Sequence, residues 1–234
     1  MIARQLKALM WKDLRVNRLI IVFYFIGAAI LTGAAIIILY CILPAPGQPN
    51  APYRSTTQYI GETFTLLMGL TCLMAAMLGA NSASAERVDR SDAFLAYLPP
   101  SRRLVLFSRL AAGLGLTLGL AAFNLLLIAL TYSIGDQHPS RYELRGVESF
   151  LVAAWVLFAV SWGAAACIGS SVAIGMVIGL LFPGMLWMSF MNTGWLWGLH
   201  GDLAYVTCEA AEVGLGLVAL ACGYVVAMKR QNSL

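Results

Sequence analysis

Apolar residues fill this chain in long runs that a few polar stretches interrupt. A helix needs about 20 residues to cross the hydrocarbon core of a bilayer. Runs of 16 to 29 residues lie at approximately 19–43, 60–83, 104–132, 149–169, 172–190 and 213–228. The pattern predicts an all-α, polytopic membrane protein of one domain with six transmembrane helices.

The division between the fourth and fifth of these helices depends on chain length and charge. Residues 149–190 are free of charged side chains and too long for one span, and the small residues 169–171 can form a turn. With a division there, both chain ends lie on one side of the membrane. Five Lys and Arg residues before the first span, five in the segment 86–109 and two after the last span then share that side, against three on the other. The positive-inside rule favours this arrangement.

Residues 2–18 predict an amphipathic helix before the first span. Its apolar side carries Ile2, Leu6, Leu9, Met10, Leu14 and Val16, and its basic side carries Arg4, Lys7, Arg15 and Arg18. Such a helix lies in the membrane interface with its basic side at the lipid headgroups. Asp13 falls near the apolar side and does not fit the pattern. A simple anchor without a further role is equally compatible.

Composition and motifs narrow the function. Hydrophobic residues make up 60% and charged residues 11% of the chain, with a mean hydropathy of +0.80, which excludes an ordinary soluble domain. The five cysteines show no CxxC spacing and are interpreted as small packing residues. Neither histidine has an acid or nucleophile at motif spacing, and none of the lysines follows a glycine, as a phosphate-binding loop requires. We predict no catalytic residue, no metal and no nucleic-acid partner.

The segment 86–109 is a charged island between the second and third spans, with eight Asp, Glu and Arg residues. Ser91 is a suitable helix N-cap, with Asp92 favourable at the positive end of the helix. Phe94, Leu95 and Leu98 follow at helical spacing, and Pro99 with Pro100 ends the helix. Ser101 can cap the next helix, which opens with Arg102 and Arg103. The order of surface helix, rigid stop and basic anchor predicts a docking element.

This island resembles the cytosolic segment between the second and third spans of permease subunits of ABC transporters of the type-2 exporter class. That family carries a Glu, a Gly-Thr pair, a Leu-rich turn, a Pro and a basic residue in this order. The matching positions here are Glu86, Ser91 in place of Thr, Phe94, Leu95, Leu98, Pro99, Ser101 and Arg102. Arg90 stands where the family often has Gly, and Ala93 where it often has an acid. An amphipathic helix before the first span is also typical of the family.

The resemblance implies a permease subunit that couples ATP hydrolysis by separate ATPase subunits to export. ATP and Mg would be bound by the partner ATPase, and this chain would hold no cofactor. Partners would be the ATPase subunits, a second permease copy, identical or related, and membrane lipids. The location would be the cell membrane, in a bacterium the inner membrane, with both termini cytoplasmic. The coupling segment would be 86–103, with the docking residues Glu86, Arg87, Ser91, Phe94, Leu95, Leu98 and Pro99.

Three polar residues within the predicted spans are candidates for a translocation path or for packing: Glu62, Arg109 and Asn124. Glu62 fits the outer interface equally well, and Arg109 fits a side chain that snorkels to the inner one. Asn124 lies deeper and is expected to make an interhelical hydrogen bond.

Further features leave alternatives open. The pairs Gly115–Gly119 and Gly175–Gly179 would allow helices to approach closely, either within the chain or between copies. Residues 191–212 combine glycine with tryptophan and acid, which predicts short re-entrant or surface helices rather than a span. A membrane scaffold or sensor that binds a partner through the same island is the alternative function, and an intramembrane enzyme with an unfamiliar site is a more distant one.

Overall fold

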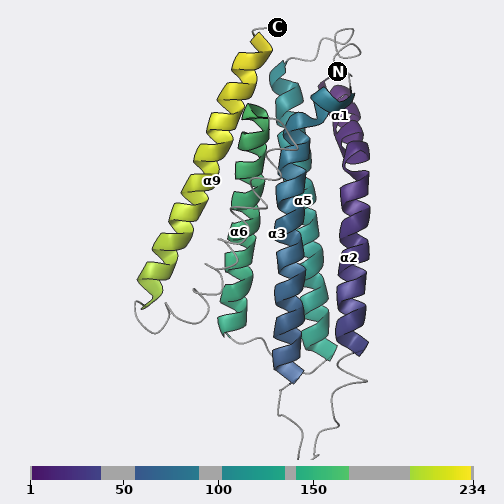
Figure 1. The fold of residues 1–234 in the computed structure, drawn as a ribbon, viewed down its shortest axis with the longest axis vertical. Helices are drawn as coiled ribbons and strands as arrows, with labels where there is room; N and C mark the ends of the chain where they lie inside the picture. Colours follow the sequence, from purple (N-terminus) through teal and green to yellow (C-terminus); the bar gives the residue numbers. More distant parts are fainter. Residues whose placement is uncertain (1, 38–55, 90–101, 135–140, 169–200, 233–234) are drawn as a thin grey trace, which may run out of the picture.

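The computed structural model describes residues 2–37, 56–89, 102–134, 141–168 and 201–232, which are almost entirely helical and include no strand. The helices are α1 (Ile2–Val16), α2 (Arg18–Ile37), α3 (Thr56–Asp89), α5 (Arg102–Ile134), α6 (Arg141–Cys167) and α9 (Gly201–Asn232). They form an elongated bundle in which both chain termini lie at the same end (Figure 1). The prediction of an all-α fold is confirmed.

Four of these helices contain an apolar stretch long enough to cross a membrane. The stretches are Phe64–Ala83 in α3, Leu104–Leu130 in α5, Leu144–Cys167 in α6 and Glu209–Lys229 in α9. The helices α1 and α2 together meet the same criterion but meet at a bend of 55°, which gives up to five spans in the described ranges. The chain therefore has the helices of a multi-pass membrane protein. The predicted span at 172–190 lies outside the described residues.

The helices α3 and α6 form the centre of the bundle. Met68, Leu78, Leu157, Phe158 and Trp162 from these two helices are fully buried. The helices α2 and α5 pack on α3, α9 packs on α6, and α1 contacts mainly α5. The outer helices expose large apolar side chains along much of their length, which suits a surface that faces lipid rather than water.

Contacts between the helices fix their directions. Cys72 of α3 donates to the carbonyl of Phe150 in α6, and Gly79 lies against the carbonyl of Phe158, so residue numbers rise together and α3 is parallel to α6. Gly27 of α2 faces Leu70 of α3, whereas Asn17 bonds to Asn81, so α2 runs against α3.

The same reasoning applies to α6 and α9. Trp155 of α6 lies against Gly216 of α9, and eight residues later Gly163 lies against Gly223. The two helices are therefore parallel and in close contact, and Figure 1 shows α9 beside α6. A Cβ on Gly163 would lie only 2.7 Å from the carbonyl oxygen of Ala219, so the approach of the backbones requires glycine here.

Helix ends differ from the predicted span ends in an informative way. The helices α3 and α5 are 34 and 33 residues long, which at about 1.5 Å per residue gives roughly 50 Å, compared with about 30 Å of hydrocarbon. Both are therefore longer than the hydrocarbon core is thick. Apolarity marks the part of a helix that lies in lipid and carries no information on where its hydrogen bonding stops.

The prediction of short re-entrant or surface helices for residues 191–212 is wrong for residues 201–212, which begin one long helix. Residues 191–200 lie outside the described ranges. The helix α9 begins at Gly201 and continues without a break through Glu209 and Glu212 into the last apolar run. From 202 to 213 the sequence contains neither Pro nor Gly, so nothing in the backbone interrupts a helix there. Glu209 and Glu212 indicate a polar environment, but a helix can continue without a break into a polar environment.

Candidate functional site: buried polar groups and the end of α3

Buried polar side chains of three helices meet at one level of the bundle. Tyr24 of α2, Thr71 of α3 and Asn124 of α5 are all almost completely buried. The amide Nδ2 of Asn124 donates to the carbonyl of Leu67, at 3.0 Å, and to the hydroxyl of Thr71. The Tyr24 hydroxyl donates to the carbonyl of Leu120 at 3.1 Å and interacts with the side chains of Thr71 and Asn124. We call these three side chains the Asn124 cluster.

The Asn124 cluster holds α2, α3 and α5 together by polar contacts in an otherwise apolar interior. Hydrogen bonds between membrane helices contribute modestly, about 0.6 kcal/mol on average and up to about 1.7. The Oδ1 atom of Asn124 is buried and accepts no hydrogen bond from the described residues. Asn124 thus makes the expected interhelical hydrogen bond and presents one further acceptor inside the bundle.

A second polar contact lies where α1 meets α2. Asn17 is buried between the two helices, and its Nδ2 donates to the carbonyl of Asp13 at 2.9 Å. The backbone amide of Asn17 donates to the same carbonyl at 3.1 Å, so the side chain competes with the helical hydrogen bond at the bend. Asn81 of α3 donates to Oδ1 of Asn17 at 2.7 Å, which attaches the bend to α3.

Charged residues at this end of the bundle are also buried. Asp13 is 5% exposed, which explains its departure from the amphipathic pattern, since α1 packs against α5 and α3 on this side. Arg109 of α5 is 4% exposed and does not snorkel to the surface. It lies 15 residues from Asn124, about 22 Å along the helix axis. The two residues therefore belong to different parts of the bundle and form no common site.

The remaining predicted site residues are placed only in part. Glu62, Glu86 and Arg87 belong to α3, the last two near its end at Asp89, but their side chains lie outside the description. The predicted coupling helix at 91–98 lies outside the described residues, and with it Ser91, Phe94, Leu95, Leu98 and Pro99. The structure shows the two helices that flank it, with α3 ending at Asp89 and α5 beginning at Arg102.

Sequence reasoning identified Asn124 and overlooked its partners. Tyr24 and Thr71 are ordinary residues in apolar helices, and only the fold brings them together. The sequence does offer a signal for the contact between Asn17 and Asn81, because each is an amide side chain close to the end of an apolar run. Within the ranges that the structure describes, His, Cys, Asp and Glu side chains form no group of three that could hold a metal ion. No protein-family model, curated protein or solved structure matches the chain.

Proposed function

We propose that the chain is the membrane-spanning permease subunit of an ATP-driven ABC exporter. The observation that supports the proposal is the position of the two helix ends that flank the island, α3 at Asp89 and α5 at Arg102. Two helices longer than the bilayer, α3 and α5, flank residues 90–101 at one end of the bundle. Asn81 lies near that end of α3 and bonds to Asn17 near the N-terminus, so this end of α3 and the N-terminal helix belong to the same side. A docking segment for a cytosolic ATPase needs this position.

Six spans are the topology that best accommodates the parallel helices. Because α6 and α9 run in the same direction, the chain between them has to return to the opposite end of the bundle. The apolar run at 172–190 is the segment available for that return. The count of spans is then even, in agreement with the two termini at one end in Figure 1. The excess of Lys and Arg at this end supports a cytoplasmic orientation.

The mechanism that follows is a two-state movement. Closure of the ATPase subunits would shift the docked segment at 91–98, and the rigid pair Pro99–Pro100 would transmit the shift to α5. In α5 the movement reaches Asn124, whose hydrogen bonds join α5 to α3. The substrate would pass between two permease subunits, identical or related, rather than through the packed interior of one.

Co-purification is the test of this function. The chain would be expressed with an ATPase that carries a phosphate-binding loop and is encoded next to it, and the complex would be reconstituted in vesicles. We expect the ATPase to co-purify with the chain and to hydrolyse ATP faster when bound to it, while the chain purified alone hydrolyses none. ATP hydrolysis by the rigorously purified chain, or failure of any such ATPase to bind, contradicts the proposal and favours a scaffold or sensor in the second case.

A further inference from the structure

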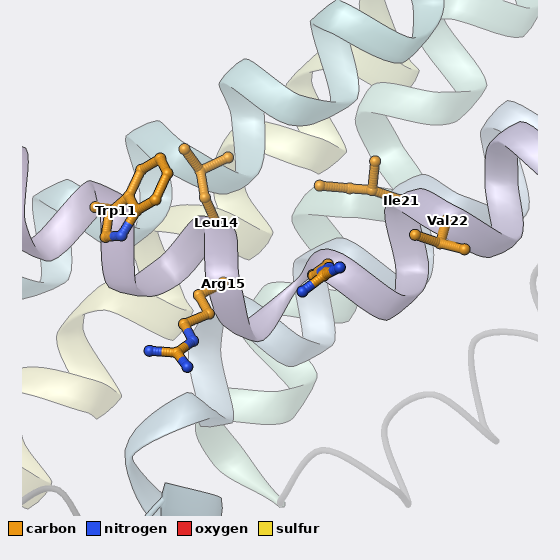
Figure 2. A pocket seen from close by; sticks show the side chains of 6 residues that line it. Trp11, Leu14, Arg15, Ile21 and Val22 are labelled. Atoms are coloured by element: carbon orange, nitrogen blue, oxygen red, sulfur yellow. The ribbon is translucent and has the colours of Figure 1, made fainter.

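A groove lies at the bend between α1 and α2. Six side chains line about 440 Å³ of space in it: Trp11, Leu14, Arg15, Arg18, Ile21 and Val22. Figure 2 shows the labelled members of this set distributed along both arms of the bend, with the Arg15 guanidinium directed away from the helix. The volume is in the range of ligand-binding pockets, about 300–1,000 Å³.

The groove combines two cations with apolar walls. Arg15 and Arg18 are exposed, and none of the six lining residues is acidic. Trp11 is 72% exposed and Val22 43%, so two large apolar groups lie open at the same place. Asp13, the nearest acid in the sequence, is buried and does not line the groove.

The position of the groove decides which anion fits it. Arg18 opens the apolar helix α2, so the two arginines stand at the level where hydrocarbon gives way to headgroups. A guanidinium binds phosphate oxygens through two parallel hydrogen bonds, which makes arginine the preferred side chain for phosphate recognition. Tryptophan is favoured at the same level of the membrane, where its ring contacts both lipid chains and headgroups.

We propose that this groove binds one anionic phospholipid. Arg15 and Arg18 hold its phosphate, and Trp11, Leu14, Ile21 and Val22 contact the glycerol and the first part of the acyl chains. A free phosphate ion would satisfy the arginines and leave the apolar walls unused. The inference requires only that the chain lies in a membrane and does not depend on the proposed transport function.

The site also depends on the bend. Asn17 lies between Arg15 and Arg18, and its hydrogen bonds to the Asp13 carbonyl and to Asn81 hold α1 at 55° to α2. In a straight helix the three-residue spacing would place the arginines on a convex surface, without the concave wall. Lipid binding and the bend therefore stabilise each other.

Native mass spectrometry of the detergent-solubilised chain tests the site with dilauroyl phosphatidylglycerol as the probe. Dilauroyl phosphatidylcholine is the neutral comparison, and inorganic phosphate is the competitor that represents a free anion. We expect one phosphatidylglycerol to bind with an affinity at least about tenfold above that of phosphatidylcholine, because each basic residue contributes about a factor of five toward an anionic lipid. Excess phosphate should not displace it.

Two double variants separate a built site from general attraction between charges. Arg15→Gln with Arg18→Gln should weaken phosphatidylglycerol binding about 30-fold. Lys7→Gln with Lys229→Gln removes the same charge from exposed positions outside the groove and should change binding less than twofold. Trp11→Ala should weaken the binding of both lipids and leave the binding of inorganic phosphate unchanged.

Three outcomes overturn the proposal. Equal losses in the two double variants show a diffuse electrostatic attraction without a site. Equal affinities of the unmodified chain for the two lipids show that the groove does not distinguish an anionic from a neutral headgroup. This comparison needs no variant and therefore holds even where a variant fails to fold. If inorganic phosphate displaces phosphatidylglycerol at a comparable affinity, the groove is a site for small anions and the proposal of a lipid site is wrong.

Discussion

Asn124 is an amide side chain enclosed by apolar helices, and its two donor contacts reach α3 rather than its own helix. The acceptors do not depend on it, because the Leu67 carbonyl also receives the Thr71 hydroxyl. Removing Asn124 therefore leaves no new buried group without a partner. Its loss should therefore lower the free energy of unfolding by about the contribution of its own hydrogen bonds.

The first prediction concerns this residue. Asn124→Leu should lower the free energy of unfolding by about 1 kcal/mol, the scale of interhelical hydrogen bonds in membranes. Thr117→Val is the matched control in the same helix, since Thr117 is also buried but donates to the carbonyl of Gly113 within α5. The measurement is unfolding in mixed micelles by titration with a denaturing detergent. An equal or larger loss of unfolding free energy in Thr117→Val would contradict the interhelical role of Asn124.

The second prediction concerns Gly79, which lies against the backbone carbonyl of Phe158. A methyl group there has to push α3 and α6 apart, and we expect Gly79→Ala to cost about 2 kcal/mol in the same unfolding measurement. Gly69 lies on the same helix with open space at its Cβ position. Gly69→Ala should leave stability unchanged or raise it by less than about 1 kcal/mol. Similar losses at both positions would contradict the close packing of α3 on α6.

At the scale of elements, the bend between α1 and α2 is the feature that depends most on a few side chains. Asn17 competes for a backbone carbonyl and is held by Asn81. A helix former at this position should allow α1 and α2 to align, since the backbone hydrogen bonds on both sides of Asn17 are already helical.

The third prediction follows. Spin labels at Lys7 and Ile30, both exposed, report the distance across the bend by pulsed electron paramagnetic resonance. Asn17→Ala should lengthen the mean distance by up to about 4 Å, the difference between a 55° bend and a straight helix at about 1.5 Å per residue. Asn81→Ala, which removes only the contact to α3, should broaden the distances with a smaller shift. An unchanged distance in Asn17→Ala would show that packing alone sets the bend.

The fourth prediction concerns the island between α3 and α5. Phe94, Leu95 and Leu98 are the expected anchors of ATPase docking, because apolar side chains in pockets dominate such interfaces. Phe94→Ala should weaken association with the ATPase by about 2 kcal/mol, roughly 30-fold. Arg87→Ala should affect mainly the association rate and its salt dependence. Glu86→Gln is expected to reduce coupled transport more than association.

Co-purification with parallel transport assays distinguishes these variants. Should Phe94→Ala bind and transport like the parent chain while Arg87→Ala fails, the island is an electrostatic patch for lipid or a partner, and the docking helix is wrong.

The elements also show what the sequence could and could not predict. The apolar runs at 60–83, 104–132 and 149–169 overlap the long apolar stretches of α3, α5 and α6. They could not place the start of α9 at Gly201, because the acids at 209 and 212 indicate a polar environment and carry no information on whether the helix continues. Nor could they indicate that Tyr24 and Thr71 meet Asn124, since that contact depends on helix directions and rotations that no local pattern encodes.

At the scale of the whole molecule, the number of membrane crossings determines on which side each loop lies. The directions of α3, α6 and α9, all parallel, require the chain to return twice to the same starting end. The first return is α5, and the second is the proposed span at 172–190. Charge supports the same topology independently, since twelve of the 15 Lys and Arg residues then lie on one side, five before the first span, five in the island and two at the C-terminus.

Labelling of single cysteines tests this topology most directly. In a background without the five native cysteines, Cys introduced at Ser55 or Ser140 should react with an impermeant thiol reagent added outside intact cells. Cys introduced at Ser91 or Ser233 should react only after the membrane is permeabilised. Labelling of position 233 from outside would give an odd number of crossings, which contradicts six spans and a C-terminus on the same side as the island.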